Sequence, residues 1–121
     1  MRAASVGMAC VFAVGAFVQL NDPDPWLWIL AYSVAAAMSL AAALGVRPVA
    51  VNAGLALVFA LWFASLAPTL VGAPQAAFSS FEMQAAAHEE PREAVGLLLL
   101  AVWSAGLAAW GARARSHVVP Q

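Results

Sequence analysis

Four long apolar runs divide the chain, and a polar stretch separates each run from the next. The runs cover residues 3–20, 26–45, 49–71 and 94–111. Each is close to the roughly 20 residues that a helix needs to cross about 30 Å of hydrocarbon. Because lipid offers backbone groups no hydrogen-bond partner, runs of this length can pair their own backbone only as helices. The pattern therefore predicts one all-α domain of four transmembrane helices and excludes strands.

The residues between the runs are those that end and begin helices. The segment 21–25 contains two Asx-Pro steps, and the residue before a proline is pushed out of the helical region. Asp24 is the predicted N-cap of the second helix, with Pro25 at its first position. Gly45 and Pro48 are predicted to end the second helix and open the third. These short connections make the first three helices an antiparallel up-down-up set.

The third connection, residues 72–93, is longer than the other two. Its apolar residues recur at a spacing that suits a short amphipathic helix over residues 75–88, with Phe78 and Phe81 on the face toward the lipid interface. A loop without regular structure explains the same segment equally well. The sequence leaves both alternatives open.

Small residues recur at intervals of four in every run. In lipid, helices associate through close packing of such residues, so we expect a compact bundle. Trp26, Trp28 and Trp110 lie near run ends, where an aromatic belt is expected at the membrane surface. The predicted packing stripes are Ser5/Ala9/Ala13, Ala31/Ala35/Ser39/Ala43, Ala56/Ala60/Ala64 and Ala101/Ala105/Ala109.

The charges separate across the four predicted crossings. Counting crossings places Arg2, Arg47, Arg113 and Arg115 on one side, and all six acidic residues on the other side together with Arg92. Cytoplasmic segments carry the excess of arginine, so both termini are predicted to be cytoplasmic.

Composition narrows the function classes further. The chain is 64 % hydrophobic and 9 % charged, whereas soluble domains have about 25 % charged residues. The net charge is −1 and the chain has no lysine, which argues against nucleic acid as a partner. The chain also lacks the glycine-rich motifs that bind the phosphates of a nucleotide. The expected contacts are the lipid bilayer and a membrane protein partner. An alanine-rich, lysine-free sequence is typical of a GC-rich bacterial source, which predicts the bacterial cytoplasmic membrane.

Two polar clusters on the acidic side carry the candidate chemistry. Several carboxylates and one histidine are the ligand types of a divalent cation site. The two clusters meet to form such a site if the first, second and fourth helices are neighbours. Helix capping, dipole compensation and an ion pair of Arg92 with Asp22 or Asp24 explain the same residues without a ligand. Acid/base catalysis is a third interpretation, and no catalytic residue is assigned. The candidate site residues are Asn21, Asp22, Asp24, His88, Glu89, Glu90, Arg92 and Glu93.

Two segments resemble a known family. The segment from residue 16 to 24 reads Ala-Phe-Val-Gln-Leu-Asn-Asp-Pro-Asp and is followed by Trp28 and Tyr32; the segment from 89 to 93 reads Glu-Glu-Pro-Arg-Glu and is followed by Gly96 and Trp103. Their order and separation are similar to the transmembrane protein 220 family. The resemblance implies a compact multi-pass helical membrane protein and assigns no activity.

The sequence favours a non-enzymatic structural or accessory membrane protein whose outer acidic cluster binds a cation or a partner. One alternative is a small cation transporter or channel subunit, although such proteins need ionisable groups within the membrane. The other is a metal-dependent membrane enzyme that acts at the outer lipid surface, which requires the two clusters to converge.

Overall fold

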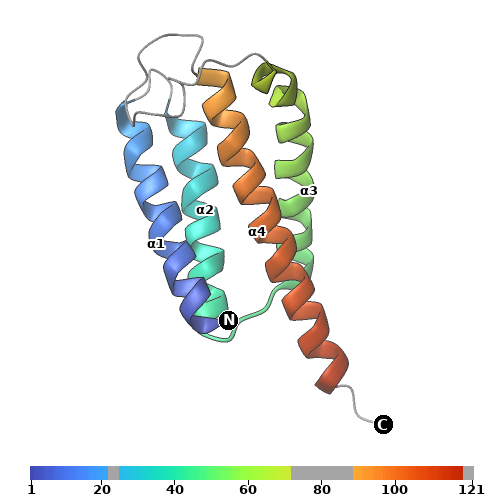
Figure 1. Cartoon of the computed structure of the whole chain (residues 1–121). Helices are drawn as coiled ribbons and strands as arrows, with labels where there is room; N and C mark the ends of the chain where they lie inside the picture. Colours follow the sequence, from blue (N-terminus) through green and yellow to red (C-terminus); the bar gives the residue numbers. More distant parts are fainter. Residues whose placement is uncertain (22–24, 72–88, 119–121) are drawn as a thin grey trace.

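The fold is an all-α bundle, as the sequence predicts (Figure 1). The computed structural model describes residues 1–21, 25–71 and 89–118. Within these ranges every regular element is helical. The four α-helices are α1 (Arg2–Val18), α2 (Trp26–Ala43), α3 (Val49–Leu66) and α4 (Glu89–Val118), and two short 3₁₀ turns, η1 (Gln19–Asn21) and η2 (Ala67–Leu70), extend α1 and α3.

The bounds of α4 differ from the prediction of residues 94–111. The helix begins at Glu89 and ends at Val118. Pro91 is its third residue, where the missing backbone N–H costs nothing because first-turn N–H groups have no partner within the helix. Glutamates in that turn also complement the helix dipole. The predicted bounds followed the apolar run of the sequence, so they did not include the polar first and last turns of α4.

The other predicted helices are close to the observed ones. α2 ends at Ala43, two residues before the predicted end at residue 45. The predicted tails of the first and third helices are the 3₁₀ turns η1 and η2. At the start of α2, the N–H of Ile29 donates to the carbonyl of Pro25 at 2.8 Å, so Pro25 already supports the first turn. The predicted cap, Asp24, lies outside the described residues.

The turn between α2 and α3 confirms the role predicted for Gly45. This glycine has φ +88°, a backbone conformation that residues with a Cβ rarely adopt. Its N–H donates to the carbonyl of Ala42 at 3.0 Å, and the N–H of Val46 donates to Ala41 at 2.9 Å. This pair of bonds is the Schellman arrangement, which satisfies the last carbonyls of a helix.

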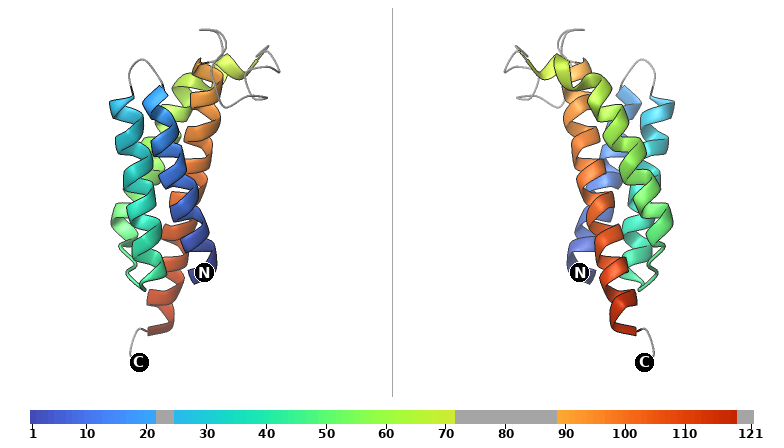
Figure 2. Two further views of the ribbon diagram at one scale, coloured as in Figure 1. Left: turned by 90° about the vertical axis from the view of Figure 1, so that its left-hand side faces the viewer. Right: turned by 90° about the vertical axis from the view of Figure 1, so that its right-hand side faces the viewer.

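The bundle is built from two antiparallel pairs. α1 packs along α2, α3 packs along α4, and α2 contacts α4 where the pairs meet (Figures 1 and 2). Side chains from all four helices fill the centre, and Phe12, Leu97 and Leu100 are 0 % exposed. Trp28 of α2 stacks on Trp62 of α3 with ring centroids 4.5 Å apart.

The small-residue stripes were predicted with mixed success. Ala31, Ala35, Ser39 and Ala43 are all buried, which confirms the stripe on α2. The prediction for α3 is wrong, because Ala60 and Ala64 are exposed. On α4, Ala101 is the only residue of the predicted stripe that is buried. Alanine is so frequent in this chain that a spacing of four also arises on faces that do not pack.

The outer surface of the bundle is apolar. Phe17 and Trp26 are 72 % and 74 % exposed, and leucines and valines cover the same surface on every helix. Trp28 is buried, so its prediction as a belt residue is wrong. α2, α3 and residues Glu93–Ala114 of α4 are long and apolar enough to cross a membrane, and α1 is a shorter apolar helix.

The two ends of the bundle differ in charge. Residue 1, the turn between α2 and α3 and the last turns of α4 lie at one end, here called the arginine end because it carries Arg2, Arg47 and Arg113 (Figures 1 and 2). η1, the start of α2, η2 and the first turn of α4 lie at the opposite end. We call this the carboxylate end, because α4 begins there with Glu89, Glu90 and Glu93.

Candidate functional site

The structure brings the backbone of the two predicted clusters to the same end of the bundle. Asn21 closes η1, and Glu89, Glu90, Arg92 and Glu93 belong to the first turns of α4, so both segments reach the carboxylate end (Figure 1).

Several predictions about this end fall outside the described part of the chain. Asp22, Asp24 and His88 are not described, nor are the side chains of Asn21, Glu89, Glu90 and Arg92. The predicted ion pair of Arg92 and the convergence of the two clusters therefore stay predictions. The amphipathic helix over residues 75–88 also stays a prediction.

Glu93 is the candidate residue whose side chain the structure places. It is half-buried and begins the apolar part of α4, immediately before the buried residues Ala94 and Leu97. A carboxylate in this position stands at the boundary between the polar first turn and the hydrophobic span. Removal of a carboxylate from water is costly unless a positive charge or hydrogen bonds compensate it.

Tyr32 of α2 packs between α1 and α4, in a position that the sequence alone did not indicate. A Cβ on Gly15 of α1 would lie 3.1 Å from its ring, and a Cβ on Gly96 of α4 would overlap its hydroxyl group. The ring also lies beside Phe12, with centroids 6.3 Å apart. Because Glu93 precedes Gly96 by three residues, both lie on the same face of α4. The Tyr32 hydroxyl therefore approaches α4 about one helical turn deeper than Glu93.

A signal for Tyr32 was present in the sequence. Glycine inside a helix destabilises it, so a glycine retained there often marks a close approach of another group. Gly15 and Gly96 are two such positions, and both accommodate the same ring.

A hydrogen bond one heptad deeper also joins α2 and α4. The Nε1 of Trp103 donates to the Oγ of Ser39 at 2.8 Å, and this hydroxyl donates to the carbonyl of Ala35 at 2.8 Å. Tyr32 and Ser39 are seven residues apart on α2, as Gly96 and Trp103 are on α4. The two parallel helices therefore keep one register over this length. Trp103 and Trp62 are both half-buried and pack against the core.

Among the residues that the structure describes, two buried polar atoms have no hydrogen-bond partner: the Oγ of Ser5 and the Oδ1 of Asn52. Ser5 is on α1 and Asn52 on α3, both within the first turns from the arginine end. Unpaired buried polar groups cost free energy, so these two atoms lower the stability of the core.

Two arginine side chains hold the described part of the arginine end together. The Nε of Arg2 donates to the carbonyl of Ala43 at 3.1 Å and thereby ties α1 to the end of α2. The guanidinium carbon of Arg47 lies 4.1 Å from the centre of the Trp110 ring, a cation–π contact between the turn and α4.

A metal site is not formed by the part of the chain that the structure describes. Within residues 1–21, 25–71 and 89–118, no three His, Cys, Asp or Glu residues are placed to hold an ion. Glu93 is the only candidate site residue in these ranges whose side chain can be assessed.

The long apolar helices and their exposed hydrophobic side chains define the chain as an integral membrane protein. A comparison with known families agrees. The family model described as "Transmembrane family 220, helix" matches residues 11–109. The chain belongs to this family, which confirms the resemblance. No solved structure matches the chain.

Proposed function

We propose that this protein crosses a bacterial cytoplasmic membrane four times, with its arginine end in the cytoplasm. In this proposal it is a non-enzymatic structural or accessory protein, and its carboxylate end binds a cation or a positively charged partner. The 17-residue α1 crosses together with α2, because the two helices pack along each other and η1 adds three residues to α1.

The observation that carries this proposal is the position of Glu93. Its carboxylate is half-buried at the start of the apolar part of α4, and Glu89 and Glu90 precede it in the same first turns. Carboxylates this close repel each other, and like charges four residues apart destabilise a helix. A bound cation, or a cationic side chain of a partner, would offset that repulsion.

The packing of the bundle supports a structural role. Side chains from all four helices fill the centre, and contacts between α2 and α4 fix the relation of the two helical pairs. The sequence places no Asp, Glu, Lys, Arg or His between residues 3 and 21, 25 and 46, 48 and 81, or 94 and 112.

A small cation transporter or channel subunit is the second candidate. It is favoured by the unpartnered atoms of Ser5 and Asn52, because polar atoms inside a membrane bundle can belong to an ion path. It has less support, since ion paths through membranes usually carry ionisable side chains and the apolar parts of this chain have none.

Thermal unfolding of the purified protein with and without divalent cations tests the proposal. A ligand that binds only the folded state raises the melting temperature by mass action. We expect calcium, magnesium, manganese or zinc to raise it relative to chelator, and Glu93→Gln and Asp24→Asn to reduce that rise. Glu82→Gln removes the same charge outside the two clusters and serves as the matched control, which keeps the full rise.

The opposite result is equally clear. If no divalent cation shifts the transition and Glu93→Gln and Asp24→Asn melt as the wild type does, the carboxylates act as helix caps and bind no cation. A shift of equal size in all variants would place the cation elsewhere on the protein.

A further inference from the structure

The arginine end has an excess of positive charge with no acidic residue of its own. The sequence contains no Asp or Glu before Asp22, none between Pro25 and Phe81 and none after Glu93. The helices that contain Arg2 and Arg113, and the turn that contains Arg47, carry these residues to one end of the bundle. Cations gathered in this way attract an anion from outside the chain.

Two of these arginines are held in place by neutral groups. Arg2 uses its Nε–H on the carbonyl of Ala43, which leaves its two terminal amino groups to donate elsewhere. The guanidinium of Arg47 contacts the face of Trp110, while its N–H groups point outward in the guanidinium plane. A guanidinium already held in place loses less conformational entropy when it binds an anion.

The surroundings of Arg47 are apolar. Leu44 and Val46, in the same turn, are 73 % and 55 % exposed, so the turn presents hydrophobic side chains next to a charge. A short segment with this composition suits the boundary between lipid headgroups and acyl chains, where the apolar side chains enter the hydrocarbon and the charge stays at headgroup level.

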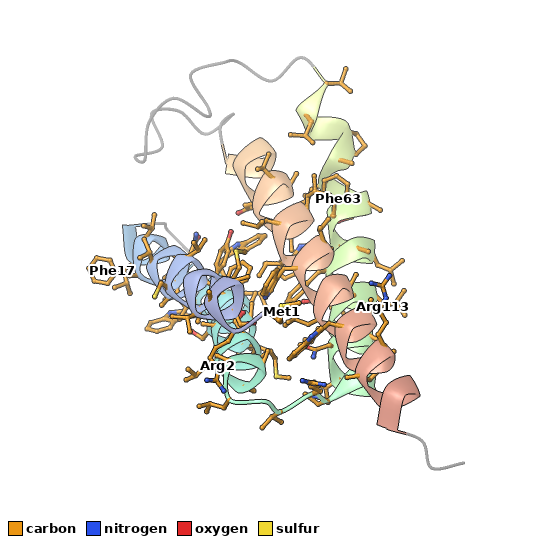
Figure 3. All side chains as sticks on the ribbon, turned by 60° about the horizontal axis from the view of Figure 1, so that its bottom comes forward. Met1, Arg2, Phe17, Phe63 and Arg113 are labelled. Atoms are coloured by element: carbon orange, nitrogen blue, oxygen red, sulfur yellow. The ribbon has the colours of Figure 1, made fainter. Side chains whose placement is uncertain are left out.

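Arg2 and Arg113 lie on different sides of this end. In Figure 3, which turns the end toward the viewer, Arg2 lies on the side of α1 and α2, and Arg113 lies on the side of α3 and α4. A small soluble anion would not reach both of these residues at once. The headgroups that surround a membrane bundle reach each arginine of this end.

We propose that the arginine end binds the phosphate groups of anionic phospholipids. Arg47, held on Trp110, is the principal contact, and Arg2 and Arg113 bind neighbouring headgroups. Guanidinium groups suit phosphate because their N–H groups form a planar fork that matches two of its oxygens. Basic positions between membrane helices are known to recognise acidic headgroups in this way. The proposal concerns the end of the bundle opposite to the cation site and does not depend on that site.

Native mass spectrometry of the purified protein with added lipid tests this. Phosphatidylglycerol and phosphatidylcholine are titrated separately, and their dissociation constants are compared. We expect phosphatidylglycerol to bind more tightly. Arg47→Gln should weaken its binding about fivefold, the effect of one charge near the membrane surface, and leave phosphatidylcholine unchanged. Arg92→Gln makes the same change at the carboxylate end and should bind as the wild type does.

Trp110→Leu provides a second variant that keeps every charge. If Trp110 holds Arg47 in place, this variant also weakens phosphatidylglycerol binding. Arg113→Gln, which removes another charge from the same end, weakens it as well. The wild-type comparison stands even if one variant fails to fold. Equal affinity of the wild type for both lipids would overturn the proposal, as would wild-type affinity in a folded Arg47→Gln variant.

Discussion

At the scale of single residues, Tyr32 shows how the two helical pairs are fitted together. Its ring lies against Gly15 of α1 and its hydroxyl against Gly96 of α4, so one side chain of α2 touches both neighbouring helices. A methyl group on Gly96 would overlap the hydroxyl, and one on Gly15 would be in tight contact with the ring, which would have to shift by a few tenths of an ångström. The glycines therefore permit the close approach of the tyrosine, which offsets their cost to helix stability.

Gly96→Ala should destabilise the protein by about 1–3 kcal/mol, the usual cost of overpacking a core. The new methyl group would overlap the Tyr32 hydroxyl. Tyr32→Phe removes that hydroxyl, so the double variant should be more stable than the sum of the two single changes implies. The free energy of unfolding, measured by SDS titration in mixed micelles, tests this. Gly106→Ala is the control, because no atom lies within 4 Å of its added Cβ.

The hydrogen bond from Trp103 to Ser39 gives a second prediction at this scale. Ser39→Ala leaves the buried indole N–H without its acceptor, and we expect a loss of about 1 kcal/mol. Trp103→Phe removes the donor, so Ser39→Ala should cost much less in that background. A double-mutant cycle in the same SDS titration measures the coupling, and additive effects would show that the bond contributes nothing.

The sequence predicted only part of the site at residue level. Glu93 was selected because charge and position along the chain are visible in a sequence. Tyr32 was not selected, because its role depends on contacts with Gly15 and Gly96 on two other helices. Trp28 was assigned to the membrane surface from its place near a run end, but its stacking on Trp62 depends on how α2 and α3 are rotated. The hydropathy of the sequence does not determine how the two helices are rotated about their axes.

At the scale of elements, local sequence signals determined most helix ends. Gly45 terminates α2 in the way predicted, although the helix itself ends at Ala43, because few other residues adopt φ +88° without strain. The first turn of α4 was missed for the opposite reason. Glu89, Glu90 and Pro91 suit a first helical turn, but they are polar and lie outside the apolar run that was used to set the boundary.

Gly45→Ala should cost about 1–2 kcal/mol, the penalty for an L-residue in the left-handed conformation. The substitution meets no neighbouring atom, so the backbone conformation is the only source of the loss. Gly54→Ala inside α3 also has open space around its Cβ and a helical backbone, and should be neutral or stabilising. Comparison of the two unfolding free energies separates strain in the turn from packing.

At the scale of the whole molecule, the bundle separates its charges over the length of its helices. Two helical pairs joined by α2 and α4 hold the arginine end apart from the carboxylate end. The all-α architecture and the helix order followed from the sequence, because run length and turn residues determine them. The pairing of α3 with α4 did not, since residues 72–88 connect them without a short turn that requires adjacency.

The central claim is that four crossings place the two charged ends on opposite faces of the membrane. Single cysteines at Val46, Ser80 and Ser116, in a Cys10→Ala background, test it by labelling intact cells with a membrane-impermeant maleimide. Ser80 belongs to the connection whose outer location rests on the sequence. The account predicts that Ser80→Cys is labelled in intact cells, whereas Val46→Cys and Ser116→Cys are labelled only after permeabilisation. Labelling of Val46→Cys and Ser80→Cys from the same face would contradict it.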